Sequence, residues 1–308
     1  MTSRAPGKAL ALHLAVLALL FALQFALPDY HHTNVARIMV LAAYALGYNV
    51  LLGYTGLMSL GHAMFFAVGM YGAGLPAYYL GFTPALAFAA GVAAGAAFAL
   101  VFGLLALRTS GVSFLIVSLM VAQAFYLATL HFNEITLGDQ GFILTLGLEH
   151  PAVKYNAAFA LFSLSLLGCL ALRLSPVGRV LIAIRENEER TRLLGYDSFR
   201  YRVLSLVVSG ALAAAAGASY ALLFSYVGST FASILFSIYP LLWTLLGGAG
   251  TLLGPLLGTG LMFYLVDFAS SLTSAYLFVV GVALVVLVLW FPQGILGAVR
   301  ARWLAWLP

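Results

Sequence analysis

The chain has 308 residues, of which 64% are hydrophobic and only 7% are charged. Soluble globular proteins carry about 25% charged residues, and a soluble domain of this length has no interior large enough to hide so much apolar surface. The composition therefore excludes a soluble protein. The net charge of +5 does not indicate nucleic-acid binding, because surplus Arg and Lys in a membrane protein usually mark cytoplasmic loops.

The apolar runs are long and continuous, which predicts membrane-spanning helices rather than the short alternating strands of a barrel. The first run, residues 9–27, follows Arg4 and Lys8. A signal peptide begins in the same way, but this run is longer than a signal core and no A-x-A site follows it. We interpret it as a retained first helix. We expect ten spans, near residues 9–27, 35–52, 61–80, 85–107, 111–130, 157–174, 203–224, 236–249, 254–271 and 276–292.

Residues 236–271 could form one long helix or two shorter ones. Glycines and a proline gather in the middle of this stretch, where they would break a helix that faces lipid. We therefore predict two helices joined by a tight turn. The predicted break comprises Gly247, Gly248, Gly250, Gly254 and Pro255.

The distribution of basic residues predicts the orientation of the bundle. With ten spans and the N-terminus inside, 12 of the 14 basic residues fall on the inner side, and only Arg37 and Lys154 fall outside. Nine spans would place Arg300 and Arg302 outside. The positive-inside rule therefore favours ten spans with both termini in the cytoplasm.

One inner loop, residues 175–202, differs from all the others. Ser175 is suited to cap a helix, and Gly195 is a plausible stop. Arginines alternate with glutamates through the loop, so we expect short helices that lie under the bilayer. The residues alone leave two interpretations: an ordinary basic loop beside lipid headgroups, or a docking helix for a cytoplasmic protein, which the mixed charges suit better.

Ionisable groups are almost absent from the predicted span interiors. Arg37 and Asp267 lie close to span ends, His13 is expected at the inner interface, and His62 sits at a glycine-rich break. Proton-coupled carriers usually keep carboxylates or histidines inside the bundle as relays. The pattern therefore does not indicate a proton wire, although sodium sites built from backbone carbonyls stay open.

The sequence also argues against an enzyme, a cofactor or a metal site. Gly7-Lys8 is followed by Ala9, so the chain has no phosphate-binding loop. No Ser-His-Asp, paired-carboxylate or H-E-x-x-H arrangement is present. The single cysteine, Cys169, excludes an intrachain disulfide and reads as a small buried hydrophobe.

Glycine is abundant, with 31 residues, and its spacing suggests two roles. The pairs Gly91/Gly95 and Gly254/Gly258 have the spacing of closely packed membrane helices. A different cluster gathers polar side chains beside a helix break, and irregular backbone at membrane depth needs shelter from protein or a wet cavity. The candidate residues for a pathway lining or gate are Gly53, Thr55, Gly56, Ser59, Gly61 and His62.

Four stretches of this sequence resemble signatures of Liv-type permeases, the membrane subunits of branched-chain amino-acid ABC importers. They are LLGYTGLMSLGHAMFFAVGMY (51–71), GRVLIAIRENE (178–188), LGGAGTLLGP (246–255) and FPQGIL (291–296). Their order and spacing agree over nearly the whole chain, and the similarity is greater to the LivM-like branch than to the LivH-like one.

The resemblance implies an all-α polytopic bundle, similar to type II ABC importer permeases, with residues 1–308 as a single transmembrane domain. It further implies a second, LivH-like permease, cytoplasmic ABC ATPase subunits and an extracytoplasmic solute-binding protein. The chain would lie in the inner or plasma membrane of a prokaryote and would not hydrolyse ATP itself. The residues implied to couple to the ATPase are Arg179, Arg185, Glu186, Asn187 and Glu188.

Because of two departures from the family pattern, the resemblance does not determine which solute is transported. Leu57 stands where the family often has glutamine, and residues 136–141 match the glycine-rich outer loop only loosely. The alternatives are therefore an ABC permease for urea, short amides or another small polar solute, a self-contained secondary carrier, and a scaffolding membrane protein. A carrier would have no need of the docking helix.

Overall fold

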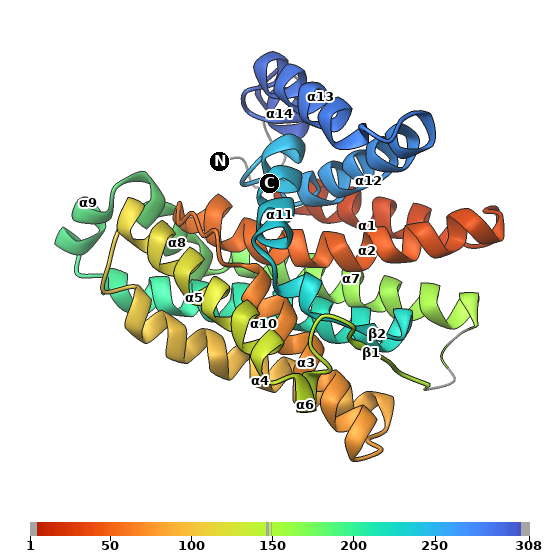
Figure 1. Cartoon of the computed structure of the whole chain (residues 1–308). Coiled ribbons are helices and arrows are strands. Elements are labelled where there is room, and N and C mark those ends of the chain that lie inside the picture. The colour runs from red at the N-terminus through yellow and green to blue at the C-terminus, as the bar shows by residue number, and fades with distance from the viewer. Residues whose placement is uncertain (1–4, 146–147, 149, 303–308) are drawn as a thin grey trace.

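The computed structural model describes residues 5–145, 148 and 150–302, and its long elements are all helices (Figure 1). Each of the ten predicted spans is a helix. The long helices are α1 (Ala5–Leu23), α2 (Asp29–Asn49, continued by the π-helix Val50–Tyr54), α3 (Ala63–Tyr79), α4 (Pro84–Ala106), α5 (Val112–His131), α7 (Pro151–Leu174), α10 (Ser198–Phe224), α11 (Ile234–Gly247), α12 (Gly254–Leu272) and α13 (Tyr276–Trp290).

Short elements occupy the connections between these helices. They are α6 (Asn133–Thr136), α8 (Pro176–Glu186), α9 (Glu188–Leu193), α14 (Ile295–Arg302), the 3₁₀-helix Ser229–Ala232 and the strands β1 (Phe142–Ile143) and β2 (Tyr226–Val227). Six helices in the described part of the chain are long and apolar enough to cross a bilayer on their own. The prediction of an all-α polytopic membrane bundle is confirmed.

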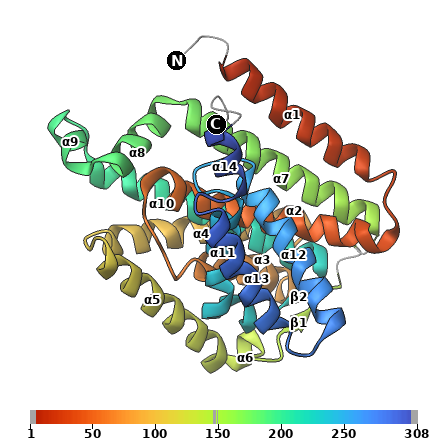
Figure 2. The same ribbon diagram turned by 90° about the horizontal axis from the view of Figure 1, so that it is seen from above.

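The centre of the bundle is α10, which packs against α2, α3, α4 and α7, while α1 lies at the edge beside α7 (Figure 2). Small residues make the closest helix contacts. A Cβ on Gly91 of α4 would lie 2.9 Å from Ala218 Cβ of α10 and 3.0 Å from Ala73 Cβ of α3, and one on Gly258 of α12 would meet the backbone of Trp243 in α11. The prediction of close packing at the glycine pairs is therefore confirmed.

The chain alternates between two ends of the bundle, and the basic residues gather at one of them. The C-terminal end of α7 meets the α11–α12 turn there, since Arg173 donates to Gly250 O. We call this end, with α8, α9 and α14, the basic end, and the other the far end. At the far end Tyr30 contacts Asp267. Arg37, near Asp267, and Lys154, in the first turn of α7, lie toward the far end, and Arg4 is outside the described residues.

Helices α3 and α11 begin inside the bundle rather than at its surface. The backbone N–H of Ala63, at the start of α3, donates to Ser237 Oγ in the first turn of α11 at 3.0 Å. From this meeting point α3 runs 17 residues to the far end and α11 runs 14 residues to the basic end. At about 1.5 Å per residue, each covers only part of a bilayer. Their N-termini therefore meet in the interior.

The irregular segment that leads into α3 is satisfied by neighbouring side chains. The Ser59 carbonyl accepts from Tyr48 Oη at 2.9 Å, and the Leu60 N–H donates to Ser118 Oγ at 3.1 Å. Protein shelters this backbone from lipid, as membrane depth requires. The predicted break near residues 53–62 is thus a π-helix followed by an irregular stretch that begins with Gly56 at positive φ.

Two details of the sequence interpretation were wrong. Residues 28–34, between the first two predicted spans, were expected to be a loop, but α2 begins at Asp29 directly after Pro28. Residues 131–156 were also expected to be a loop, but they contain α6 and β1, and β1 pairs antiparallel with β2; a two-residue strand gives too short a pattern to detect. His13 of α1 is 1% exposed, and its Nδ1 bonds to Ala9 O.

Candidate coupling site and helix breaks

Helix α8 is amphipathic and lies under the basic end of the bundle. Ser175 caps it, since its Oγ accepts from the Gly178 N–H at 3.1 Å, and the cap bond satisfies one of the otherwise unpaired first-turn donors. Apolar side chains at helical spacing fix the inner face: Val180, Leu181 and Ile184 are buried. The predicted coupling residues Arg179, Arg185, Glu186 and Asn187 are exposed, and Glu188 is half-buried.

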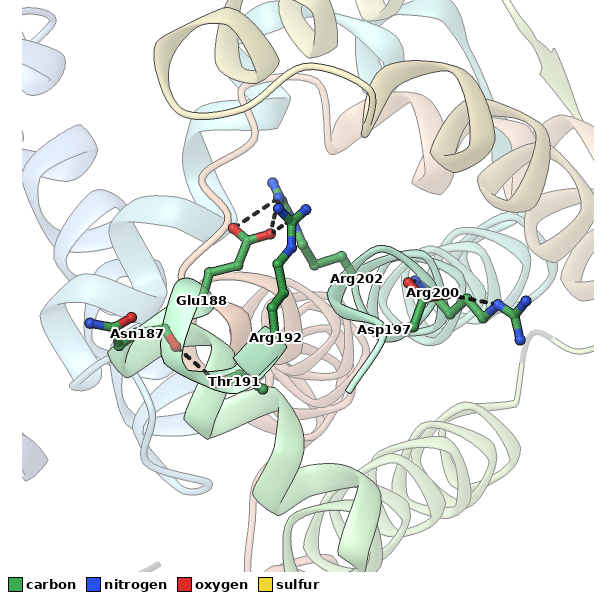
Figure 3. A network of polar contacts seen from close by, with 7 residues as sticks. All are labelled: Asn187, Glu188, Thr191, Arg192, Asp197, Arg200 and Arg202. Atoms are coloured by element: carbon green, nitrogen blue, oxygen red, sulfur yellow. Dashed lines mark hydrogen bonds and ion pairs between the residues drawn. The ribbon is translucent and has the colours of Figure 1, made fainter. Parts of the chain in front are cut away.

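The end of α8 is formed by Asn187, which turns the chain into α9. Its backbone is extended, and its Oδ1 accepts from the Arg190 N–H at 2.9 Å as the cap of α9. Glu188 then pairs with Arg192 at 3.5 Å and with Arg202 of α10 at 3.2 Å (Figure 3). The Arg202 side chain is only 9% exposed, so this pair fixes α9 to the start of α10.

Two arginines at the basic end, one in α7 and one in α8, contact the two helix breaks. Arg185 of α8 donates to the carbonyl of Gly53 in the π-helix, and Arg173 of α7 donates to the carbonyl of Gly250 in the α11–α12 turn. Asn49 completes the contact, because its Oδ1 accepts from the Gly250 N–H at 2.8 Å. We call Asn49, Gly53, Arg173, Arg185 and Gly250 the coupling junction.

Glycine is required at the junction by close approach and by backbone conformation. A Cβ on Gly53 would lie 2.7 Å from Gly250 N, and Gly250 itself has φ of +82°. Gly56 has φ of +71° and lies against Arg185 Cγ, while Gly248 has φ of +118°. Positive φ is readily adopted only by glycine. The predicted break at Gly247–Pro255 is confirmed, since α11 ends at Gly247 and α12 begins at Gly254 with Pro255 in its first turn.

The predicted pathway residues separate into two groups. Gly53 and Gly56 lie at the junction, whereas Ser59, Gly61 and His62 are buried in the interior. His62 Nε2 lies 3.4 Å from Ser209 Oγ of α10, and its ring stacks on Tyr44 with centroids 5.5 Å apart. The Thr55 hydroxyl donates to the carbonyl of Leu51. The structure thus brings Gly53, Gly56 and Gly250 to Arg185, but not His62.

A cavity of about 640 Å³ opens beside the junction, between α8, the α11–α12 turn and α14. Arg185, Thr251, Gln293 and Arg300 are among its lining residues. Burial, and then the positive charges of Arg173 and Arg185, lower the pKa of Arg300. The cavity is therefore strongly electropositive and suits an acidic partner group.

The sequence interpretation did not single out Asn49 or Arg173. A signal was available for Asn49, because it is an amide inside an apolar run directly before the glycine cluster. Nothing local marks Arg173, since an arginine at the inner end of a span is common. Among the described residues no group of three His, Cys, Asp or Glu side chains could hold a metal ion, and Cys169 is buried.

These features define a class of protein: a polytopic helical membrane protein with broken helices and one charged helical loop at one end, without catalytic chemistry among its described residues. The chain belongs to the family described as branched-chain amino acid transport system / permease component, which matches residues 33–290. It is thus the permease component of an ABC transporter, and not itself an enzyme.

Relatives in bacteria and archaea carry matching descriptions. The chain is 29% identical over 296 residues to the high-affinity branched-chain amino acid transport system permease protein LivM of Salmonella typhimurium, and 28% identical to that of Escherichia coli. Each match covers 86% of this chain and 69% of the relative. A probable LivM protein of Methanocaldococcus jannaschii is 35% identical over 85 residues, which is 27% of this chain and 25% of that protein. No solved structure matches the chain.

Proposed function

We propose that this chain is the permease subunit of an ATP-driven importer for branched-chain or related amino acids, and that α8 couples it to the ATPase. The observation that carries the proposal is the hydrogen bond from Arg185 of α8 to the Gly53 carbonyl. This hydrogen bond connects the exposed face of α8, the proposed docking surface, to the π-helix at the end of α2, directly before the irregular stretch that leads into α3. Family membership and the LivM relatives support the solute class.

The partners follow from the same reasoning. Cytoplasmic ABC ATPases would dock on α8 and α9, a LivH-like permease would complete the pathway, and an extracytoplasmic binding protein would deliver solute at the far end. The chain would then lie in the inner or plasma membrane of a prokaryotic cell, with the basic end and both termini on the cytoplasmic side. The concentration of arginines at that end supports this orientation.

The coupling junction suggests how movement would cross the membrane. An ATPase that displaces α8 displaces Arg185, and with it the Gly53 carbonyl of the π-helix. Because a Cβ on Gly53 would lie only 2.7 Å from Gly250 N, the α11–α12 turn must follow. The π-helix leads into α3 and the α11–α12 turn follows α11, so both of these helices are attached to this contact. ATP binding and hydrolysis would therefore bias the pathway between inward-open and outward-open states.

Alanine substitution on α8 tests the docking role. Replacing Arg185 and Glu186 together should leave membrane insertion intact and abolish co-purification of the ATPase. Glu186→Ala alone removes an exposed carboxylate without touching the junction, so any loss it causes reports docking rather than folding. Arg108→Ala, an exposed arginine of the α4–α5 turn at the same end, is the matched control. Undiminished ATPase co-purification and uptake in the double variant would refute the proposal.

Reconstitution of the purified chain without companions separates this proposal from a secondary carrier. We expect no accumulation of leucine against its gradient with the chain alone, and accumulation when ATPase, second permease, binding protein and ATP are present. Uphill uptake by the chain alone would show that it is self-powered.

A further inference from the structure

A second cavity, of about 350 Å³, lies between α2, α10, α11 and α12. It includes Arg37 and Asp267, which are oppositely charged, and the large side chains of Tyr239, Trp243 and Met262. Its volume lies at the lower end of the range for small-molecule sites. The cavity is remote from α8, and the coupling mechanism does not use it.

Arg37 is a buried cation near the far end of α2, and no described carboxylate forms an ion pair with it. In the part of the chain that the structure describes, its Nε is buried and lacks a hydrogen-bond partner. Its guanidinium lies over the Phe224 ring at 4.9 Å, a contact that favours the charge but leaves the donor edge free. Ionisable groups at such positions are costly and generally mark a solute pathway.

Asp267 lines the same cavity but does not pair with Arg37. Its two carboxylate oxygens each lie 3.1 Å from the hydroxyl of Tyr30, and no ion pair joins it to a described cation. A carboxylate accepts several hydrogen bonds, so capacity remains after that of Tyr30. An unpaired cation and an unpaired anion therefore line one small cavity.

The remaining walls are apolar and aromatic. Tyr239 and Trp243 stack with ring centroids 5.7 Å apart, and Met262 and Val266 contribute aliphatic surface from α12. This surface suits a hydrocarbon side chain. A neutral solute such as urea could hydrogen-bond to both groups but would neutralise neither charge, and it would leave the apolar wall without a partner.

We propose that this cavity binds a zwitterionic α-amino acid with an apolar side chain, its carboxylate on Arg37, its ammonium group on Asp267 and its side chain against Trp243 and Met262. The inference rests on the proposed function and selects amino acids over urea and short amides as the solute. Arg37 is well suited to the role because guanidinium binds carboxylate through paired donors.

Competition binding tests the assignment. The chain is purified from its own host with the subunits that accompany it, without binding protein, and titrated with tritiated L-leucine in a scintillation proximity assay. Competitors are L-leucine, L-leucinamide, which lacks the carboxylate, 4-methylpentanoic acid, which lacks the ammonium group, and urea. We expect L-leucine to compete at least about tenfold better than the others, as loss of a charged hydrogen bond implies.

Two substitutions assign the groups separately. Arg37→Gln should weaken leucine binding and abolish the preference for leucine over leucinamide, while Asp267→Asn should abolish the preference over 4-methylpentanoic acid. Lys154→Gln and Glu134→Gln, which change charges elsewhere toward the far end, should leave both preferences intact. Arg37→Lys should retain a weaker preference. If Arg37→Gln fails to assemble, the wild-type competition series and the weaker preference expected of Arg37→Lys still test whether Arg37 binds the carboxylate.

Several results would overturn the inference: no measurable leucine binding by the wild type, equal competition by leucine and leucinamide, or an unchanged preference in Arg37→Gln. Basal ATPase activity and ATPase co-purification are measured on the same preparations. If both are normal while Arg37→Gln leaves the preference for leucine unchanged, the assignment of the amino-acid site is wrong and the proposed function stands. If no ATPase accompanies the wild-type chain, the proposed function itself is wrong.

Discussion

Gly53→Ala provides the sharpest test of the coupling junction. The new methyl group would lie 2.7 Å from Gly250 N and 2.9 Å from Gly250 Cα. Both are backbone atoms, and Asn49 and Arg173 hold them in place, so the two breaks must separate. Overpacking of this kind costs about 1–3 kcal/mol, against which alanine recovers at most about 1 kcal/mol of helix propensity. Because the new contacts are with backbone atoms, we expect the upper part of that range, about 2–3 kcal/mol, which leaves a net loss of about 1–2 kcal/mol in the free energy of unfolding.

The assay is thermal unfolding of the purified chain in detergent, together with uptake and ATPase activity of the assembled transporter. A loss of 1 kcal/mol corresponds to about 2–4 °C for a chain of this size class, so Gly53→Ala should melt about 2–8 °C below the wild type. Gly168→Ala is the matched control, because nothing lies within 4 Å of its Cβ position in α7. It should be neutral or slightly stabilising. The reasoning fails if both variants melt alike and Gly53→Ala transports at the wild-type rate.

Three further outcomes are expected. Arg202→Gln removes a cation that is 9% exposed and leaves Glu188 with only the exposed Arg192 as its partner, so it should cost about 1–3 kcal/mol in thermal melts. Arg200→Gln, at 86% exposure, should cost about 0–1 kcal/mol, and equal costs would contradict the assigned pairing. Ser175→Ala should cost about 1 kcal/mol by leaving the Gly178 N–H without its cap, and Ser175→Asn should restore most of it in the same melts. Cys169 should resist maleimide in native membranes and react after denaturation in detergent, because it is buried; rapid native labelling would show that α7 is more open.

The sequence was sufficient for the parts of the fold that depend on local patterns. Long apolar runs located the helices, and the glycines and proline between Gly247 and Pro255 located the α11–α12 turn. Ser175 and Gly195 delimited the short helices α8 and α9. Each of these features is set by residues within one or two turns of one another, so a single sequence contains the whole signal.

The depth of α3 and α11 in the bundle could not be predicted in the same way. An apolar run has the same composition whether it begins at a surface or at a meeting point such as Ala63 and Ser237. The contacts of the site were equally hidden. Arg185 was expected to face a partner, but its hydrogen bond to Gly53 spans 132 residues, and Arg37 and Asp267 line the same cavity only because α2 and α12 pack together. Long-range pairing has no periodicity to detect.

The bond between Asn49 and the α11–α12 turn also bears on biosynthesis. The amide of Asn49 is satisfied by Gly250 and Thr251, which are 201 and 202 residues later in the chain. Translation at about 5–20 residues per second then separates the two by about 10–40 s, during which α2 lies in or beside the bilayer with a polar side chain exposed to lipid. Ribosome-bound chains that stop before α11 should therefore depend on an insertase or be degraded. The α11–α12 turn thus supplies the hydrogen-bond partners that stabilise α2 in the bilayer.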